Sequence, residues 1–195
     1  GRQWTVAAGH LVLAPGAYER PVPIPGWTLP GVMTTGAAQT LARAYRTFPG
    51  ERAVIGGNGP LNIQLAAELL RAGVRVAAVI EEAPAPWTAW KPTLRALRAA
   101  PGLMAQGLRE LATLRAAGVP VHWGSRITAI EGEERARACL VEGAAGRLRI
   151  EADVFTLGHG FVPSTEIARQ LGCAHTHVAR HLGFLATAAD EDGRT

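Results

Sequence analysis

The sequence predicts an α/β fold: a parallel sheet packed against helices, with an added antiparallel β-meander. Three observations support this prediction. Apolar strand-like runs at 52–56 and 74–80 enclose a segment, 61–72, whose apolar residues recur every three and four positions, as in a helix. Helical and strand-like segments then alternate up to residue 123, which favours a parallel sheet. Short strand candidates separated by glycines and charges follow at 126–131, 135–142 and 147–151.

The composition is that of a globular protein and excludes several classes of partner. Of the 195 residues, 48% are hydrophobic and 18% are charged, which is enough apolar material for a core. The formal net charge is +4, but the basic residues are scattered, so we expect no nucleic-acid partner. No apolar run reaches the roughly 18 residues that a membrane span needs.

Cysteine and histidine usage favours a cytoplasmic protein without a metal. Cys139 and Cys173 lie far apart and form no C-x-x-C pair, so we expect neither a redox-active disulfide of that type nor a zinc site. Reduced cysteines and the lack of a visible signal-peptide pattern predict a cytoplasmic location. The spacing of His175, His177 and His181 could suit a metal, but no acidic residue completes the pattern. We interpret these histidines as a surface cluster.

The first 48 residues combine strand-like, proline-rich and helical patterns. Residues 3–14 are typical of a strand and are followed by Pro15-Gly16. Prolines at positions 21, 23, 25 and 30 forbid a helix and predict an ordered, extended connector. Residues 35–45 predict a short helix, and Pro49-Gly50 breaks the chain after it.

A strand–turn–helix–strand unit comes next. Its first strand, 52–56, leads into the tight turn Gly57-Asn58-Gly59-Pro60. Pro60 suits the first turn of the helix at 61–72, where the missing proline N–H leaves no hydrogen bond unmade. The second strand, 74–80, leads into two adjacent acids, Glu81 and Glu82.

This unit predicts a dinucleotide-binding site of the Rossmann type. In such a site Gly57 would make the tight turn and Gly59 would let the backbone approach the pyrophosphate, which the free N–H groups and the helix dipole attract. The third position of the motif is normally a glycine that lets helix and strand pack closely, but here it is Asn62. We therefore expect the Asn62 side chain to push the helix away from the strand or to crowd the phosphates.

The acid at the end of the second strand indicates which nucleotide would bind. Glu81 stands 24 residues after Gly57 (81 − 57), where a carboxylate typically hydrogen-bonds the adenosine ribose. Glu81 and Glu82 would both repel a 2′-phosphate, so a nicotinamide cofactor here would be NAD rather than NADP. Because of Asn62, two interpretations stay open: a site that binds NAD, and a Rossmann-like unit that has lost its ligand.

The rest of the chain completes the alternating pattern. Residues 93–117 predict one or two helices with a break at Pro101-Gly102, and 119–123 predicts a strand. A further strand at 153–157 runs into Gly158-His159-Gly160, which places His159 either near a cofactor edge or at a turn. No side chain stands out as a catalytic nucleophile, acid or base, and the catalytic residues stay unknown.

Several segments resemble one known superfamily. Leu11–Gly16 resembles the strand end of flavoproteins with two dinucleotide-binding domains, and Asp153–Thr165 resembles their return passage from the nicotinamide domain. The chain thus resembles the pyridine nucleotide-disulfide oxidoreductase superfamily of FAD/NAD(P)-binding proteins. Tyr18–Pro21, Gly57–Leu61 and Gly160–Thr165 look most like the branch that holds the FAD-binding subunits of opine oxidases, proline and hydroxyproline dehydrogenases and hydrogen cyanide synthase.

The resemblance implies a central fragment of such a protein. Residues 1–48 would be a partial FAD-domain segment and connector, 49–158 an NAD(P)-binding-like Rossmann domain with a meander at about 126–151, and 159–195 a return segment to the FAD domain. The family's first flavin fingerprint and its later Gly-Asp motif are missing, so we expect the isolated chain to be colourless and inactive. The missing C-x-x-C argues against a disulfide reductase.

The resemblance also implies cofactors, partners and site residues. The parent protein would use FAD to carry electrons from an amine, amino acid or opine, together with a partner subunit. Alternatives are an NADH:acceptor reductase and a degenerate nucleotide domain that serves as a scaffold for subunit assembly. The implied cofactor contacts are Gly57, Asn58, Gly59, Pro60, Leu61 and Glu81 on the nicotinamide side, and Ala14, Gly16, Gly158 and Gly160 on the flavin side.

Overall fold

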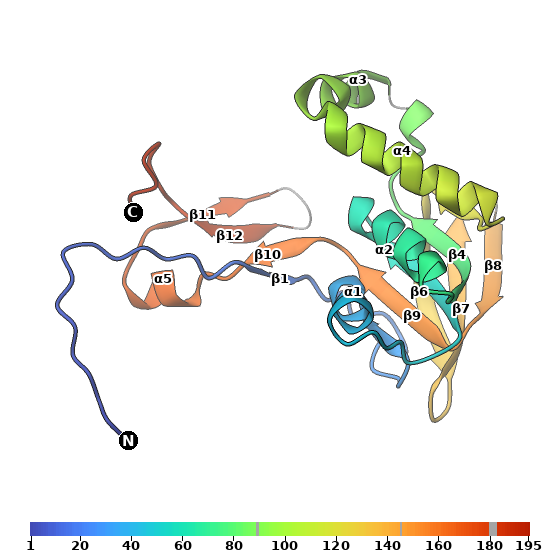
Figure 1. The fold of residues 1–195 in the computed structure, drawn as a ribbon, viewed down its shortest axis with the longest axis horizontal. Helices are drawn as coiled ribbons and strands as arrows, with labels where there is room; N and C mark the ends of the chain where they lie inside the picture. The colour runs from blue at the N-terminus through green and yellow to red at the C-terminus, as the bar shows by residue number, and fades with distance from the viewer. Residues whose placement is uncertain (89, 145, 180–182) are drawn as a thin grey trace. The chain divides into compact units, whose positions relative to one another are not determined.

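The computed structural model describes residues 1–88, 90–144, 146–179 and 183–195, and these form two compact units. Residues 19–160 make up the larger unit, and residues 1–18 together with 161–195 make up the smaller one. Figure 1 shows the elements of both units along the chain. Most of the predicted connector, 19–48, packs within the larger unit. The predicted functional division at residues 48/49 and 158/159 stays a prediction.

A five-stranded parallel sheet forms the centre of the larger unit, as the sequence predicts. Its strand order is β2-β9-β3-β4-β5, and each neighbouring pair is parallel. The middle strand β3 therefore has β9 on one side and β4 on the other, although β9 lies about a hundred residues further along the chain. The strands are β2 (Val32–Thr34), β3 (Arg52–Gly57), β4 (Arg75–Glu81), β5 (Val121–Trp123) and β9 (Val154–Gly158).

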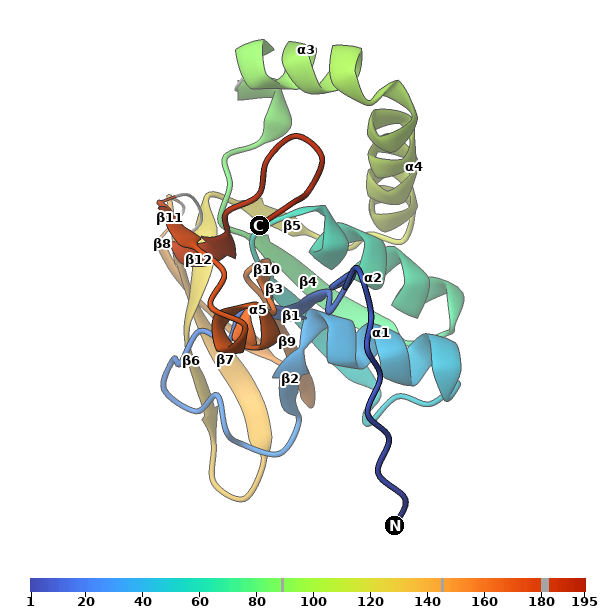
Figure 2. The ribbon, with the colours of Figure 1, turned by 90° about the vertical axis from the view of Figure 1, so that its left-hand side faces the viewer.

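Helices cover one face of this sheet and an antiparallel meander covers the other (Figure 2). Ile55 and Val79 pack with Leu65 of a covering helix, whereas Val54 and Ile80 pack with Ile127 of the meander. The alternation of these residues follows from the two-residue period of a strand. The elements are α1 (Thr35–Ala44), α2 (Pro60–Arg71) and α4 (Pro101–Ala116) on the first face, and β6 (Ser125–Gly132), β7 (Ala136–Gly143) and β8 (Gly146–Glu151) on the second.

The crossover from β4 to β5 holds the predicted pair of helices and their break. A 3-10 turn, η1 (Pro86–Thr88), precedes α3 (Trp90–Ala99), and Ala100 separates α3 from α4. Pro101 starts α4 at a position where proline needs no N–H partner. No helix among the described residues is both long and apolar enough to cross a membrane.

The proline-rich connector contains a strand of the sheet, which the sequence did not predict. β2 pairs in parallel with β9 at the edge of the sheet. The prolines take part through their carbonyl groups: the Ile130 N–H donates to Pro25 O at 2.8 Å, and the Ala136 N–H donates to Pro30 O at 2.9 Å. The connector is therefore ordered by accepting bonds from the meander, a role for which proline needs no N–H.

The smaller unit corrects one prediction. Residues 3–14 form no strand, because no described strand pairs with them, and an apolar extended segment needs a neighbour for its N–H and C=O groups. The elements found are β1 (Ala17–Glu19, whose last residue belongs to the larger unit) paired with β10 (Phe161–Pro163), α5 (Glu166–Gln170), and the antiparallel pair β11 (His175–Val178) and β12 (Phe184–Thr187).

Candidate nucleotide-binding site

The predicted glycine turn lies at the carboxyl edge of the sheet. Gly57 at the end of β3 is in register with Glu81 at the end of β4 and with Gly158 at the end of β9. The chain passes from β3 through α2 to β4 on one side of β3, whereas β9 pairs with β3 on its other side, so the strand order reverses between β3 and β9. Such a switch point at the carboxyl ends of parallel strands is where open α/β sheets bind ligands.

Both glycines of the turn have conformations that other residues rarely adopt. The φ angle is +136° at Gly57 and +118° at Gly59. A Cβ atom at Gly57 would collide with the backbone of Gly158, so Gly57 permits the close approach of β3 and β9. A Cβ at Gly59 would have no atom within 4 Å, so open space lies beside the residue that precedes the N-terminus of α2.

The N–H groups of the turn are largely used by the protein itself. The Asn58 N–H donates to Gly158 O at 2.8 Å, and the Gly59 N–H donates to the Glu81 carboxylate. Pro60 has no N–H, and the N–H of Asn62 reaches Gly59 O at 3.2 Å. Leu61 supplies the remaining donor, because a helix cannot pair its first N–H groups internally. The open side of Gly59, the Leu61 N–H and the positive end of the α2 dipole give this corner the features that attract an anion.

Asn62 does not behave as the sequence predicts. Its side chain is 1% exposed and turns into the protein: Nδ2 donates to Gly158 O at 3.0 Å, and Oδ1 accepts from Thr35 Oγ1 at 2.7 Å. The amide thus connects α2 to β9 and to α1 and leaves the phosphate corner free. It fits because Gly158 has no side chain, and a Cβ there would collide with Asn62 and Thr35. The side chain therefore points away from the Gly59 corner, contrary to the expectation that it crowds the phosphates, while its predicted effect on the spacing between helix and strand stays a prediction.

Glu81 braces the turn from the end of β4. Its carboxylate accepts the Gly59 N–H at 3.0 Å (Oε2) and 3.3 Å (Oε1), and the Ala83 N–H at 3.0 Å. The residue is 2% exposed. Burial raises the pKa of Glu81, and the hydrogen bonds from Ala83 and Gly59 offset this only in part. In this arrangement Glu81 stabilises the turn, and its predicted contact with a ribose stays a prediction.

Glu82 and His159 join the ends of β4 and β9. The Nε2 atom of His159 lies 3.3 Å from Glu82 Oε1, with the His159 side chain 10% exposed and the Glu82 side chain 36% exposed. Both side chains lie on the meander side, two residues after the buried Ile80 and Leu157. The hydrogen bond from His159 lowers the pKa of Glu82, which outweighs the opposite effect of burial.

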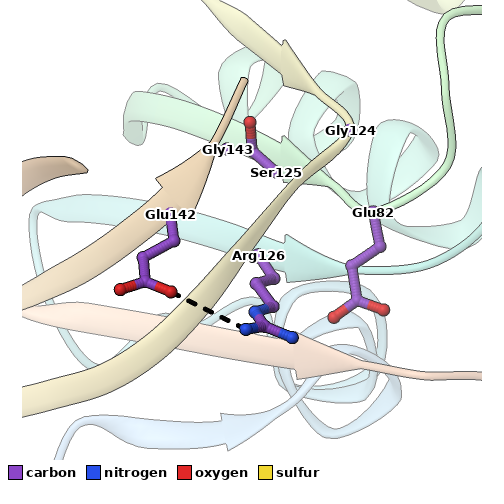
Figure 3. Close-up of a pocket in the computed structure, with 6 residues that line it drawn as sticks. All are labelled: Glu82, Gly124, Ser125, Arg126, Glu142 and Gly143. Carbon is purple, nitrogen blue, oxygen red and sulfur yellow. Dashed lines mark ion pairs between the residues drawn. The ribbon is translucent and has the colours of Figure 1, made fainter. Parts of the chain in front are cut away.

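An open hollow of about 370 Å³ lies beside Glu82. Figure 3 shows the Arg126 guanidinium between the carboxylates of Glu82 and Glu142, and Arg126 forms an ion pair with Glu142 at 3.7 Å. The sequence pattern did not indicate Arg126 or Glu142, because they come from the meander and nothing local marks the side on which a meander packs. The hollow is lined by Glu82, Gly124, Ser125, Arg126, Glu142 and Gly143.

The four residues predicted on the flavin side lie in different units. Ala14 and Gly16 belong to the smaller unit, where Gly16 O accepts the Ser164 N–H at 3.0 Å. Gly158 and Gly160 belong to the larger unit, and Gly160 O accepts the Arg20 N–H at 2.9 Å. Their contact with a flavin stays a prediction.

Metal ligation has no support in the part of the chain that is described. No group of three His, Cys, Asp or Glu residues there is arranged to hold an ion. His175 instead hydrogen-bonds to Cys173 O and Thr187 Oγ1, while His181 lies outside the described residues.

Comparison with known proteins finds relatives among subunits of oxidoreductases. The chain is 35% identical over 178 residues to the hydrogen cyanide synthase subunit HcnB of Pseudomonas aeruginosa, covering 87% of this chain and 38% of that protein. It is 37% identical over 173 residues to an opine oxidase subunit of Rhizobium meliloti, covering 86% of this chain and 32% of that protein. The structure of T. acidophilum thioredoxin reductase matches with a TM-score of 0.61 at 14% identity, over 92% of this chain and 51% of that one, which is a likeness of fold alone.

These relatives confirm the predicted resemblance to FAD/NAD(P)-binding oxidoreductases. The chain spans less than two fifths of the length of the two curated relatives. The family model for pyridine nucleotide-disulphide oxidoreductases matches residues 1–195. The chain belongs to the pyridine nucleotide-disulphide oxidoreductase family.

Proposed function

We propose that this chain is the central part of an FAD-dependent oxidoreductase subunit, and that the carboxyl edge of its parallel sheet binds NAD. The observation that carries the proposal is the Gly57–Pro60 turn at the switch point of the sheet. Its open side at Gly59 faces no other atom, and α2 begins directly after it. An anionic pyrophosphate is the ligand that suits a glycine turn at a helix N-terminus.

The relatives support the choice of reaction and the need for a partner. The matching proteins from Rhizobium meliloti and Pseudomonas aeruginosa are by name subunits of an opine oxidase and of hydrogen cyanide synthase. We therefore infer an electron-transfer subunit of an amine, amino-acid or opine dehydrogenase, which works with a second subunit in the cytoplasm. FAD would accept the electrons when bound, and Ala14, Gly16, Gly158 and Gly160 are the residues proposed to face it.

The chain's own residues would hold and select the nicotinamide nucleotide. The Leu61 N–H and the dipole of α2 would bind the pyrophosphate, which lies away from the inward-turned Asn62. The carboxylate of Glu82, which is partly exposed at the end of β4, would disfavour a 2′-phosphate and so favour NAD over NADP.

Calorimetric titration with NADH tests the proposal, with a matched pair of glycine variants. Gly59→Ala places a methyl group where the phosphate would lie. Gly73→Ala makes the same change at the far end of α2, where φ is +84° and a Cβ likewise has no atom within 4 Å. Both variants strain the backbone, by about 1 to 3 kcal/mol each. We expect submillimolar binding by the wild type and by Gly73→Ala, and at least tenfold weaker binding by Gly59→Ala.

Two outcomes would count against the proposal. If the wild type binds no NADH at millimolar concentration, the edge of the sheet is not an NAD site. If Gly59→Ala binds as tightly as Gly73→Ala, the nucleotide binds elsewhere. Circular dichroism of both variants shows whether they keep the fold.

A second candidate function is an assembly scaffold for the partner subunit. It is favoured by the use of the Asn58 and Gly59 N–H groups within the protein, which leaves few donors for a phosphate. An NADH:acceptor reductase is a further alternative. Anaerobic titration of the full-length parent, followed by flavin absorbance at about 450 nm, separates the three candidate functions. Amine substrates bleach the flavin of a dehydrogenase, and NADH bleaches the flavin of an NADH:acceptor reductase. A scaffold neither binds NADH nor changes its absorbance when NADH is added.

A further inference from the structure

The two adjacent acids at the end of β4 differ in what they can still bind. Glu81 is almost fully buried, and both of its oxygens already accept N–H groups, from Gly59 and Ala83. Val79, two residues before Glu81 in β4, packs on the helix side of the sheet. Because side chains two residues apart in a strand share a face, Glu81 lies under the glycine turn rather than in the hollow. With 2% of the residue exposed, Glu81 offers little surface to a sugar hydroxyl.

Glu82, in contrast to Glu81, has a carboxylate that is partly exposed and can accept a further hydrogen bond. Its side chain is partly exposed, lines the hollow, and engages only Oε1 in the contact with His159. Figure 3 shows the Glu82 carboxylate beside the Arg126 guanidinium, and both residues line the hollow. A carboxylate with one oxygen fixed and one oxygen free can accept hydrogen bonds from the hydroxyls of a ribose.

His159 fixes the direction of that carboxylate. The imidazole is nine-tenths buried, and its Nδ1 atom is buried with no hydrogen-bond partner among the described residues. A protonated Nδ1 would be a buried donor without an acceptor, so we assign the proton to Nε2, which donates to Glu82 Oε1. His159 is then a positioning residue, set by the backbone of β9 on the opposite side of β3.

We propose that the hollow beside Glu82 receives the adenosine ribose of a dinucleotide, with Glu82 as its ligand, His159 as the residue that positions Glu82, and Glu81 as a brace of the glycine turn. This assignment rests on the proposed function, because it presumes that the edge of the sheet binds a dinucleotide. It moves ribose recognition from Glu81 to its neighbour.

Arg126 gives the proposal a distinctive consequence. In the wild type its guanidinium lies between two carboxylates, of which Glu142 also pairs with Arg147 at 2.8 Å. Glu82 excludes a 2′-phosphate by its charge. Without that charge Arg126 becomes a cation at the ribose with only Glu142 to balance it, and guanidinium groups bind phosphates strongly. Loss of the Glu82 charge should therefore weaken NADH binding and strengthen NADPH binding.

The test measures the dissociation constants of NADH and NADPH for the full-length protein by calorimetry. In Glu82→Gln we expect the preference for NADH over NADPH to fall at least tenfold. The matched variant Glu81→Gln keeps the size of the side chain at the next position, and there we expect both nucleotides to bind more weakly with the preference unchanged within about twofold. His159→Leu should weaken NADH binding, and His159→Gln, which keeps an N–H donor, should restore it.

Three outcomes of these titrations would overturn the roles assigned to Glu82, His159 or the site as a whole. A preference that survives Glu82→Gln but is lost in Glu81→Gln overturns the assignment while leaving NAD binding intact. Equal loss of NADH binding in His159→Gln and His159→Leu overturns the positioning role of His159. Failure of the wild type to bind either nucleotide overturns the proposed function and this inference together. If Glu81→Gln does not fold, the preference in Glu82→Gln alone decides.

Discussion

Replacing Asn62 by alanine should destabilise the protein, because the side chain stabilises the fold instead of obstructing a ligand. The change removes the buried hydrogen bonds from Asn62 Nδ2 to Gly158 O and from Thr35 Oγ1 to Asn62 Oδ1. Gly158 O keeps the N–H of Asn58 at 2.8 Å. The Thr35 hydroxyl, in a fully buried residue, loses its acceptor.

The expected loss follows from these contacts. Each net hydrogen bond contributes about 1 kcal/mol, and a buried polar group left without a partner costs about 1 to 3 kcal/mol. We therefore expect Asn62→Ala to lower the free energy of unfolding by roughly 2 to 4 kcal/mol. The loss should be shared with Thr35, so Thr35→Val combined with Asn62→Ala should cost less than the sum of the single changes by about 1 kcal/mol.

Urea unfolding followed by circular dichroism measures both quantities. Thr35→Ser serves as the matched control, since it keeps the hydroxyl and should change the free energy of unfolding by much less than Thr35→Val. A loss below about 0.5 kcal/mol in Asn62→Ala, or strictly additive single and double variants, would refute the account of Asn62 as a buried link between α2, β9 and α1.

Three further predictions follow from the same structure. Gly57→Ala should prevent stable folding or destabilise far more than Gly73→Ala, because its Cβ would collide with Gly158; equal urea midpoints would contradict this. Burial raises the pKa of Asp153, but hydrogen bonds from the backbone N–H groups of Glu51 and Arg52 outweigh it and leave the pKa lowered. The stabilisation by ionised Asp153 is thus complete at pH 7 and is lost as the pH falls through that lowered pKa. Asp153→Asn should therefore lower the free energy of unfolding at pH 7 and do so progressively less below about pH 4. A loss of stability that does not change with pH would contradict this prediction. Burial raises the pKa of the Cys139 thiol to about 12, so a thiol reagent at pH 8 should label Cys173 in the native protein and Cys139 only after unfolding; labelling of Cys139 in the native protein would contradict its burial.

Short-range patterns predicted the central βαβ unit well. The apolar strands around residues 52–57 and 75–81, the proline at the start of α2 and the glycine after it are properties of neighbouring residues, so a single sequence reveals them. The sequence predicted two further features in the same way, from neighbouring residues: the break between α3 and α4 and the three strands of the meander.

The features that the sequence did not predict depend on contacts between distant residues. Asn62 stands where the motif has glycine, and its meaning depends on the glycine at position 158, which supplies the space from another strand. The roles of Glu81 and Glu82 depend on which face of β4 each occupies and on His159, 77 residues from Glu82. Residues 3–14 have the composition of a strand, yet a strand also needs a paired neighbour, which composition does not reveal.

A crystal structure of the protein with bound NADH tests the central claim most directly. The account predicts the pyrophosphate over the Gly57–Pro60 turn, within hydrogen-bond distance of the Leu61 N–H, with Asn62 still bound to Gly158 O. It also predicts the adenosine ribose on Glu82 in the hollow of Figure 3. Nucleotide density away from this edge would contradict the proposed function, and a ribose bound to Glu81 would contradict the division of roles between the two acids.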